Sequence, residues 1–203
     1  MNRYCEIGIA VAATALLPLV LAQTAAEKPQ PPAGGSETYQ IDPIHSSNCF
    51  RIKHLNVAYF YGRFNEVAGT FVFNDADPAA CSFDVQVNVD SVDTHNADRD
   101  KHLKSAELFD VEKHPQITFK STSVKKMGEQ TYDVTGDLTL HGVTKPLTVK
   151  IERTGAGPGM KGEYRSGCET NFEIKRSDFG MTAMIGPLGD DVRLTFSLEG
   201  IRQ

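Results

Sequence analysis

Apolar and polar residues alternate with a period of two along most of the chain. Between residues 81 and 90 every second residue is apolar, from Phe83 to Val89, and the same pattern returns between Val192 and Leu198. Because successive side chains of a strand point to opposite faces, this alternation predicts strands with one apolar and one polar face. Such strands are typical of an antiparallel sheet that has one face in water.

Turn-forming residues divide the alternating runs into about eight strands. Breaks are predicted at residues 74–78, 127–129, 141–146, 155–159 and 185–191, and most of them contain glycine or proline. The segment 96–105 lacks alternation and predicts one short helix, with Thr94 or Asn96 as its N-cap. The element pattern therefore predicts an all-β domain, built as a sandwich or as a barrel.

Three glycines favour the barrel. Gly62, Gly69 and Gly136 fall inside or beside predicted strands, where glycine marks the bulges and bends that let a sheet close on itself. A closed barrel of about eight strands either fills its interior with side chains or holds one ligand. The chain has no tryptophan, a common filler of small cores.

The first residues have the order of a secretory signal. Arg3 is followed by a largely apolar run at 7–21 and by small residues at 22–26, so cleavage is expected after Ala22 or after Ala26. An uncleaved N-terminal anchor is the alternative. We assign residues 1–26 to a signal peptide, 27–37 to a Pro/Gly-rich linker and 38–203 to one folded domain. The mature protein is expected to be periplasmic or secreted.

Charge and cysteine content limit the partners. The net charge is −5 without a basic run, which argues against nucleic acid. Cys49, Cys81 and Cys168 lie in the predicted domain, and export would permit one disulfide with one thiol left over. A Cys49–Cys81 pair is favoured, although the other pairings stay open.

Short motifs spread over residues 38–203 match one family in their order and spacing. They are YQIDPIHSS at 39–47, Phe50, KHL at 53–55, GRF at 62–64, GTF at 69–71, DT at 93–94, RDKHL at 99–103, LFD at 108–110, HPQITFKS at 114–121, GDLT at 136–139, GVTKP at 142–146 and RSDFG at 176–180. In these motifs the chain resembles the YceI-like lipid- and polyisoprenoid-binding proteins.

The resemblance implies an exported, lipocalin-like antiparallel barrel with a long apolar tunnel for an isoprenoid chain. Members of this family are not generally regarded as enzymes. No haem ligand pair stands out in the sequence, and no cofactor is expected. The chain departs from the family pattern at 58–61, where Ala-Tyr-Phe-Tyr replaces small or polar residues, and at Cys49 and Cys81.

Alternation within the strands selects the side chains that should face the interior. These residues would contact an apolar ligand, or, in the alternative, simply fill the core. They are Phe50, Ile52, His54, Phe64, Phe71, Phe73, Val85, Val87, Ile117, Phe119, Leu138, Leu140, Val149, Phe172 and Phe196. If His54 is buried there, it requires a hydrogen-bond partner.

The predicted helix offers candidates for contact with a polar head group. His95, Arg99 and His102 are spaced i, i+4, i+7 and would share one helical face, where Arg99 could bind a pyrophosphate. The favoured alternative is structural, with Arg99 paired to Asp93 or Glu107 and both histidines in water.

Catalytic and metal sites are less well supported. Asp42, His45 and Ser46 have the residue types of a hydrolytic triad, but Gly-x-Ser-x-Gly is absent and Asp42-Pro43 is typical of a turn. No His-x-His or His-Glu-x-x-His motif supports a metal.

The sequence therefore predicts a non-enzymatic binder or carrier of a long isoprenoid-type lipid. The alternatives are an accessory that holds a quinone for membrane redox chemistry, and an enzyme that acts on bound lipid. Transient contact with a membrane is envisaged, and the oligomeric state is open, with a homodimer as one alternative.

Overall fold

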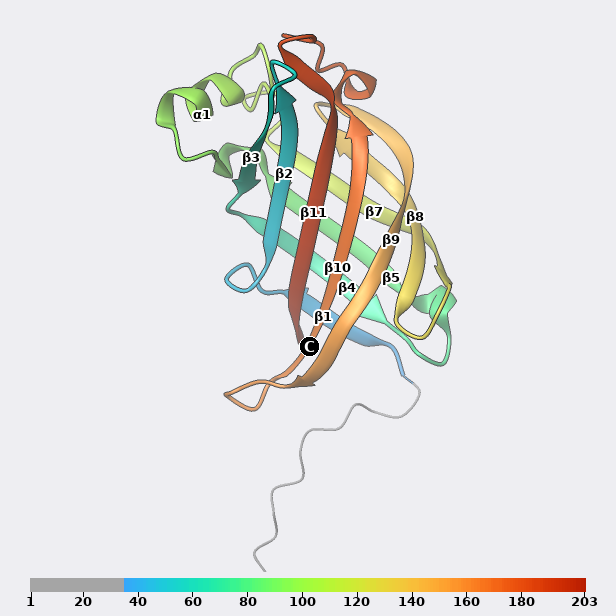
Figure 1. Ribbon diagram of the computed structural model, residues 1–203. Coiled ribbons are helices and arrows are strands. Elements are labelled where there is room, and N and C mark those ends of the chain that lie inside the picture. Colours follow the sequence, from blue (N-terminus) through green and yellow to red (C-terminus); the bar gives the residue numbers. More distant parts are fainter. Residues whose placement is uncertain (1–34) are drawn as a thin grey trace, which may run out of the picture.

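The computed structural model describes residues 35–203, so the predicted signal peptide and most of the linker lie outside the described residues. The domain is built from antiparallel strands, one α-helix and three short 3₁₀ helices (Figure 1). The elements are β1 (Glu37–Ile41), β2 (Ser47–His54), β3 (Ala58–Phe64), β4 (Val67–Phe73), η1 (Pro78–Ala80), β5 (Ser82–Asn88), η2 (Val89–Ser91), β6 (Val92–Asp93), α1 (Ala97–Lys104), β7 (Gln116–Lys126), β8 (Thr131–Leu140), β9 (Val143–Pro158), β10 (Tyr164–Lys175), η3 (Arg176–Phe179) and β11 (Leu188–Arg202). Within the described residues, no helix has the length and apolar character to cross a membrane.

Eight of the strands close into a barrel. The ring runs β1-β4-β5-β7-β8-β9-β10-β11, and pairing of β1 with β11, from Tyr39 with Arg202 to Ile41 with Gly200, completes it. All pairings between these strands are antiparallel. The predicted barrel of about eight strands is therefore confirmed, as is the single α-helix. Its N-cap is Asn96, whose side chain accepts a hydrogen bond from the amide of Arg99.

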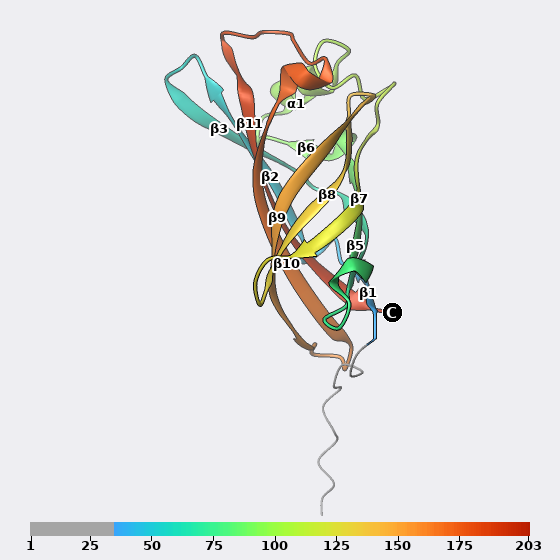
Figure 2. The same cartoon turned by 90° about the vertical axis from the view of Figure 1, so that its right-hand side faces the viewer.

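The strand β11 changes its partner along its length. Its C-terminal end pairs with β1, whereas Val192 to Ser197 pair with β2. The hairpin of β2 and β3 thus extends the wall on one side, and β3 is held at its outer edge by two residue pairs with β6. Figures 1 and 2 show α1, the tip of the β2–β3 hairpin and the β10–β11 connection at one end of the barrel.

Gly69 and Gly136, two of the three glycines that favoured a barrel, lie where neighbouring backbones approach closely. Gly69 has a φ of 125°, and a Cβ there would lie 2.0 Å from the carbonyl oxygen of Asp84. Gly136 faces the register shift of β7 between Ser121 and Ser123, where a Cβ would lie 2.5 Å from the oxygen of Lys120. Close backbone approach therefore requires glycine at both bends.

Three predicted loops are shorter than expected, and the one at 185–191 ends where β11 begins at Leu188. Gly155 to Pro158 belong to β9 and pair with β10, so the glycine-rich run is strand rather than loop. The loop predicted at 141–146 shrinks to His141 and Gly142, which both have positive φ. Such a two-residue turn suits the twist of a hairpin, and it leaves Val143 to Pro146 free to pair with β8.

Aromatic side chains fill the interior of the barrel at the end opposite to α1. Tyr39, Phe71, Phe73, Phe83 and Tyr132 are almost completely buried there, with neighbouring ring centroids 5.2–6.2 Å apart. Beyond them, Glu37 accepts a hydrogen bond of 2.6 Å from the hydroxyl of Tyr39. Burial and this contact raise the pKa of Tyr39. We call this region the closed end.

Candidate functional site

An apolar cavity occupies the barrel at the end where α1 lies. It holds about 1120 Å³ of empty volume, which includes solvent at its opening. Strands β2, β3, β7, β8, β10 and β11 supply its walls, and Leu103, Leu108 and Phe109 line it from α1 and the segment that follows. We call this volume the upper cavity.

A second apolar cavity lies deeper in the barrel, with about 600 Å³ of empty volume. Ile117 lines both cavities. On three other strands the residues that line the two cavities are two positions apart, namely Leu138 and Leu140, Phe172 and Ile174, and Phe196 and Leu194. Since residues two apart on a strand share a face, the lower and upper cavities follow each other along one apolar interior.

All but two of the predicted interior residues line these cavities. The upper cavity is lined by Phe50, Ile52, His54, Phe64 and Leu140, the lower by Val85, Val87, Phe119, Leu138, Val149, Phe172 and Phe196, and both by Ile117. Phe71 and Phe73 also point inward, but they pack in the closed end and line neither cavity. Contact of any of these side chains with a ligand stays a prediction.

Other lining residues were missed by the sequence prediction. Phe83, Ile151, Leu194 and Leu198 line the cavities and continue the alternation of predicted strands, so the same signal could have found them. Arg176, Met181 and Met184 also line the upper cavity. They lie in η3 and in the connection to β11, where no periodicity reveals which side chains face inward.

Arg99 is the best-placed cation at the open end. It lines the upper cavity, its Nε and Nη2 donate to the hydroxyl and carbonyl oxygens of Thr94 at 2.8 and 2.6 Å, and its guanidinium lies 4.1 Å from the ring centre of Phe60. The predicted ion pairs of Arg99 are wrong, because Asp93 interacts with Arg63 and Glu107 with His102. These contacts fix Arg99 without an acidic partner.

Arg176 places a second guanidinium beside the cavity. It is 4% exposed and donates to the backbone oxygens of Gly189, Met181 and Ala183 at 2.6–2.9 Å. Burial lowers its pKa. Its hydrogen bonds tie the chain between β10 and β11 over the opening. None of the described residues that line the upper cavity is acidic, whereas two of them are arginines.

The three predicted head-group residues do not share one face. His95 precedes the helix with a φ of 59°, is exposed and does not line the cavity, so the prediction is wrong for its position. His102 lines the cavity, but its Nε2 lies 2.9 Å from Glu107. His54 is exposed at the opening rather than buried as a core histidine.

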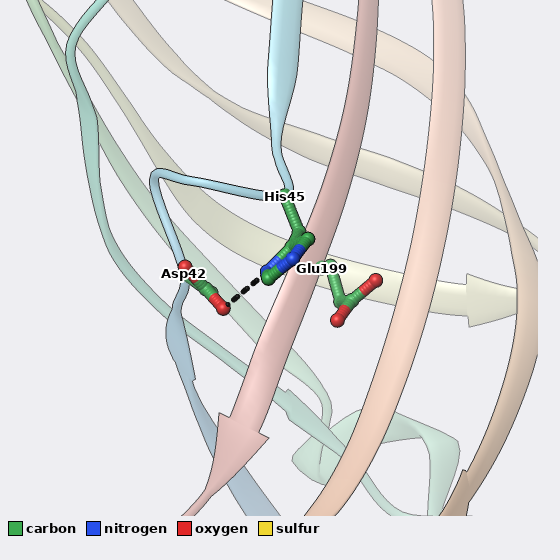
Figure 3. Close-up of side chains that lie close together, drawn as sticks. All are labelled: Asp42, His45 and Glu199. Atoms are coloured by element: carbon green, nitrogen blue, oxygen red, sulfur yellow. Dashed lines mark hydrogen bonds and ion pairs between the residues drawn. The ribbon is translucent and has the colours of Figure 1, made fainter. Parts of the chain in front are cut away.

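The residues of the supposed triad lie outside the barrel, in the turn between β1 and β2. His45 Nδ1 is 2.8 Å from Asp42 Oδ2, and both side chains lie near Glu199 (Figure 3). The hydroxyl of Ser46 bonds to the backbone of Glu199 instead of His45. Asp42, His45 and Glu199 could together ligate a metal, but the Arg165 guanidinium already bonds to both carboxylates. The cluster is therefore an ion-pair network.

The ion-pair network around Asp42 should make the free energy of unfolding depend on pH. The hydrogen bonds of His45 and Arg165 lower the pKa of Asp42 from 3.8 to about 2. A carboxylate with a lowered pKa stabilises the fold at pH values above its unfolded pKa, and the gain is lost as the pH falls towards 2. We expect Asp42→Asn to lower the free energy of unfolding by at most ~2 kcal/mol at neutral pH, since one pKa unit corresponds to about 1.4 kcal/mol.

Urea denaturation of both proteins between neutral pH and pH values near the pKa of Asp42 measures this effect. The difference between them should shrink as the pH falls through the interval between the two pKa values. The same change at Asp137, which is exposed on β8, is the control and should be nearly neutral throughout. A difference for Asp42→Asn that stays constant over this range would contradict the assignment.

The three cysteines in the described part of the chain are free. The favoured Cys49–Cys81 disulfide is therefore wrong, because Cys49 is exposed on β2 while Cys81 is buried just before β5, which is not a neighbour of β2. Cys168 lines the lower cavity, and burial raises the pKa of its thiol to about 12.

Comparison with known proteins identifies the family of this barrel. A family model described as the YceI-like domain matches residues 39–200. The chain belongs to the YceI-like family. A UPF0312 protein of Pectobacterium atrosepticum is 49% identical to this YceI-like chain over 154 residues, which are 76% of this chain and 80% of the relative.

Two solved structures share the fold of this YceI-like protein. BcnA of Burkholderia cenocepacia matches with a TM-score of 0.72 at 24% identity, over 78% of this chain and 98% of BcnA. A polyisoprenoid binding domain from Saccharophagus degradans matches with a TM-score of 0.63 at 18% identity, over 81% and 98% of the two chains. Both likenesses support the closed antiparallel barrel.

Proposed function

We propose that this YceI-like protein is a non-enzymatic carrier that binds one long isoprenoid-type lipid inside the barrel. The observation that carries the proposal is the pair of apolar cavities that meet at Ile117. Membership of the family and the likeness to a polyisoprenoid binding domain support it. In this proposal the protein acts in the periplasm or outside the cell, as the sequence of its first residues suggests.

The dimensions of the interior suit a chain of several prenyl units. On β11 the cavity-lining residues include Leu198 and Val192, a separation of about 20 Å at ~3.3 Å per residue. Carbon–carbon bonds of about 1.5 Å give roughly 5 Å per extended prenyl unit. The two cavities together therefore accommodate about four units in an extended chain.

The energy of burial also favours a long chain. Each prenyl unit of five carbons contributes roughly 3–4 kcal/mol when it is buried, at about 0.8 kcal/mol per carbon. Association and ordering of the chain offset several kcal/mol of this gain. A single unit would thus bind weakly, whereas a tail that fills both cavities would bind tightly.

Two arginines support a position of the head group at the opening. Arg99 retains a guanidinium nitrogen beyond those that donate to Thr94, and it can donate to phosphate or to a carbonyl oxygen. Arg176, which also lines the upper cavity, adds a second positive charge. The tail would then extend towards the closed end, with the head group between α1 and the β10–β11 connection.

Mass spectrometry of lipid extracted from the purified protein tests this proposal. We expect a polyprenyl lipid in stoichiometric amount. Recovery of a quinone would identify the accessory of membrane redox chemistry as the better description. Saturated acyl lipid would contradict the isoprenoid class, and conversion of an added polyprenyl lipid to a new product would contradict a purely binding role.

A further inference from the structure

Exposed apolar side chains surround the open end of the barrel. Leu55 and Val57 form the tip of the β2–β3 hairpin, Tyr59 follows on β3, and Met184 and Ile185 lie in the connection between β10 and β11. All five are exposed, and Val57 reaches 84%. We call these five residues the rim. Large apolar groups in water at one place indicate a surface that binds a partner.

Contacts hold the two halves of the rim together. The amide of Leu55 donates to the carbonyl of Pro187 at 2.7 Å, and His54 pairs with Leu188. Figures 1 and 2 show the hairpin tip and the β10–β11 connection at the same end of the molecule. Met184 and Leu188 also line the upper cavity, so the rim is continuous with the cavity wall.

The charged side chains on the hairpin half of the rim are all basic. Residues 47–65, which include the whole β2–β3 hairpin, contain Arg51, Lys53 and Arg63 but no acidic residue, in a protein with a net charge of −5. Residues 179–189 of the other half contain no charged side chain, but Asp190 and Asp191 follow directly and line one groove with Lys53. The guanidinium of Arg51 lies 4.1 Å from the ring centre of Tyr59. Tyrosine beside basic and aliphatic residues suits the interface between lipid head groups and acyl chains.

We infer that the rim docks the open end of the barrel on an anionic phospholipid bilayer. This inference rests on the proposed function, because a lipid cargo must pass between a membrane and the cavity. Leu55, Val57 and Ile185 would enter the boundary between head groups and acyl chains, while Arg51 and Lys53 would lie near the phosphates. Docking in this orientation lets a tail enter the cavity without crossing water.

Sedimentation with vesicles tests the inference. The full chain is mixed with vesicles of phosphatidylcholine alone or of phosphatidylcholine with phosphatidylglycerol. We expect the wild-type protein to bind the anionic vesicles more tightly and to be released by salt. Val57→Asp should weaken this binding about tenfold or more, as expected when the burial of one valine is lost. Lys53→Gln should weaken it about fivefold.

Ile44→Asp is the matched control, because Ile44 is also 84% exposed but lies in the turn between β1 and β2, away from the open end. It should bind vesicles like the wild type. Equal losses for Ile44→Asp and Val57→Asp, or no binding of the wild type to either vesicle, would overturn the inference. A wild-type dimer that Val57→Asp converts to a monomer without vesicle binding would instead assign the rim to a second copy of the chain.

Lipid extracted from Val57→Asp separates this inference from the proposed function. Retention of the cargo together with loss of vesicle binding supports docking through the rim. Absence of a cargo from the wild type and from every variant would contradict the carrier, and persistent vesicle binding by Val57→Asp would contradict the rim.

Discussion

Replacing Ile117 by tryptophan should abolish tight binding of long-chain lipid while the barrel still folds. Ile117 lines both cavities, so a larger side chain there separates the lower cavity from the upper one. A tail excluded from the lower cavity loses the burial of at least one prenyl unit. At about 0.8 kcal/mol per carbon, partly offset by a smaller ordering cost, we expect at least a hundredfold loss of affinity.

Titration with prenyl lipids of increasing length measures this effect. The wild type should gain affinity with each unit until both cavities are full, whereas Ile117→Trp should stop gaining once the upper cavity is full. Thr118→Trp is the matched control, since Thr118 is the next residue on β7 and points to the outer face. If Ile117→Trp follows the same length dependence as the wild type, the tail does not pass Ile117. A thermal unfolding curve checks that overpacking costs no more than about 1–3 kcal/mol.

Replacing Arg99 by alanine should weaken binding of an anionic head group by about ten- to a hundredfold. A hydrogen bond to a charged group contributes about 1.5–3 kcal/mol, which corresponds to this range. Arg99 is held in place by Thr94 and Phe60, so its guanidinium is ordered before the ligand arrives. The uncharged alcohol of the same chain length should lose little affinity, because its tail makes the same contacts.

The measurement is a comparison of two ligands, a polyprenyl phosphate and the corresponding polyprenol, with the wild type and with Arg99→Ala. Arg63→Ala provides the control, because Arg63 is a basic residue on β3 that pairs with Asp93 and does not line the cavity. Equal losses for phosphate and alcohol would show that Arg99 supports the fold of the opening and has no contact with the head group.

Alternation was sufficient to predict most of the cavity wall, because the parity of a residue on a strand determines its face. Parity does not reveal the level of a residue along the barrel axis. Phe71 and Phe73 therefore have the correct orientation but lie in the closed end, where aromatic rings from β1, β4, β5 and β8 fill the interior. The level follows from the shear between strands, and the sequence carries no local signal for it.

Positions outside regular elements were the hardest to predict. The spacing of His95 from Arg99 and His102 predicts that it lies on the same helical face. Its positive φ places it outside the helix, which begins at Ala97. Arg176 was missed because its role comes from carbonyl groups of Met181, Ala183 and Gly189, which the fold brings to it. The ion-pair network at Asp42 likewise depends on Arg165, a partner far away in the sequence.

The change of partner along β11 has a consequence for the width of the entrance. The hairpin of β2 and β3 is bonded to the barrel along β11, but its other edge is held by only two residue pairs. A small rotation of the hairpin about β11 would break few hydrogen bonds and would leave the ring of eight strands intact. For the carrier proposed above, such breathing would admit head groups wider than the resting entrance. Selection among cargoes would then depend on the tail and on the charge of the head group, and much less on the diameter of that group.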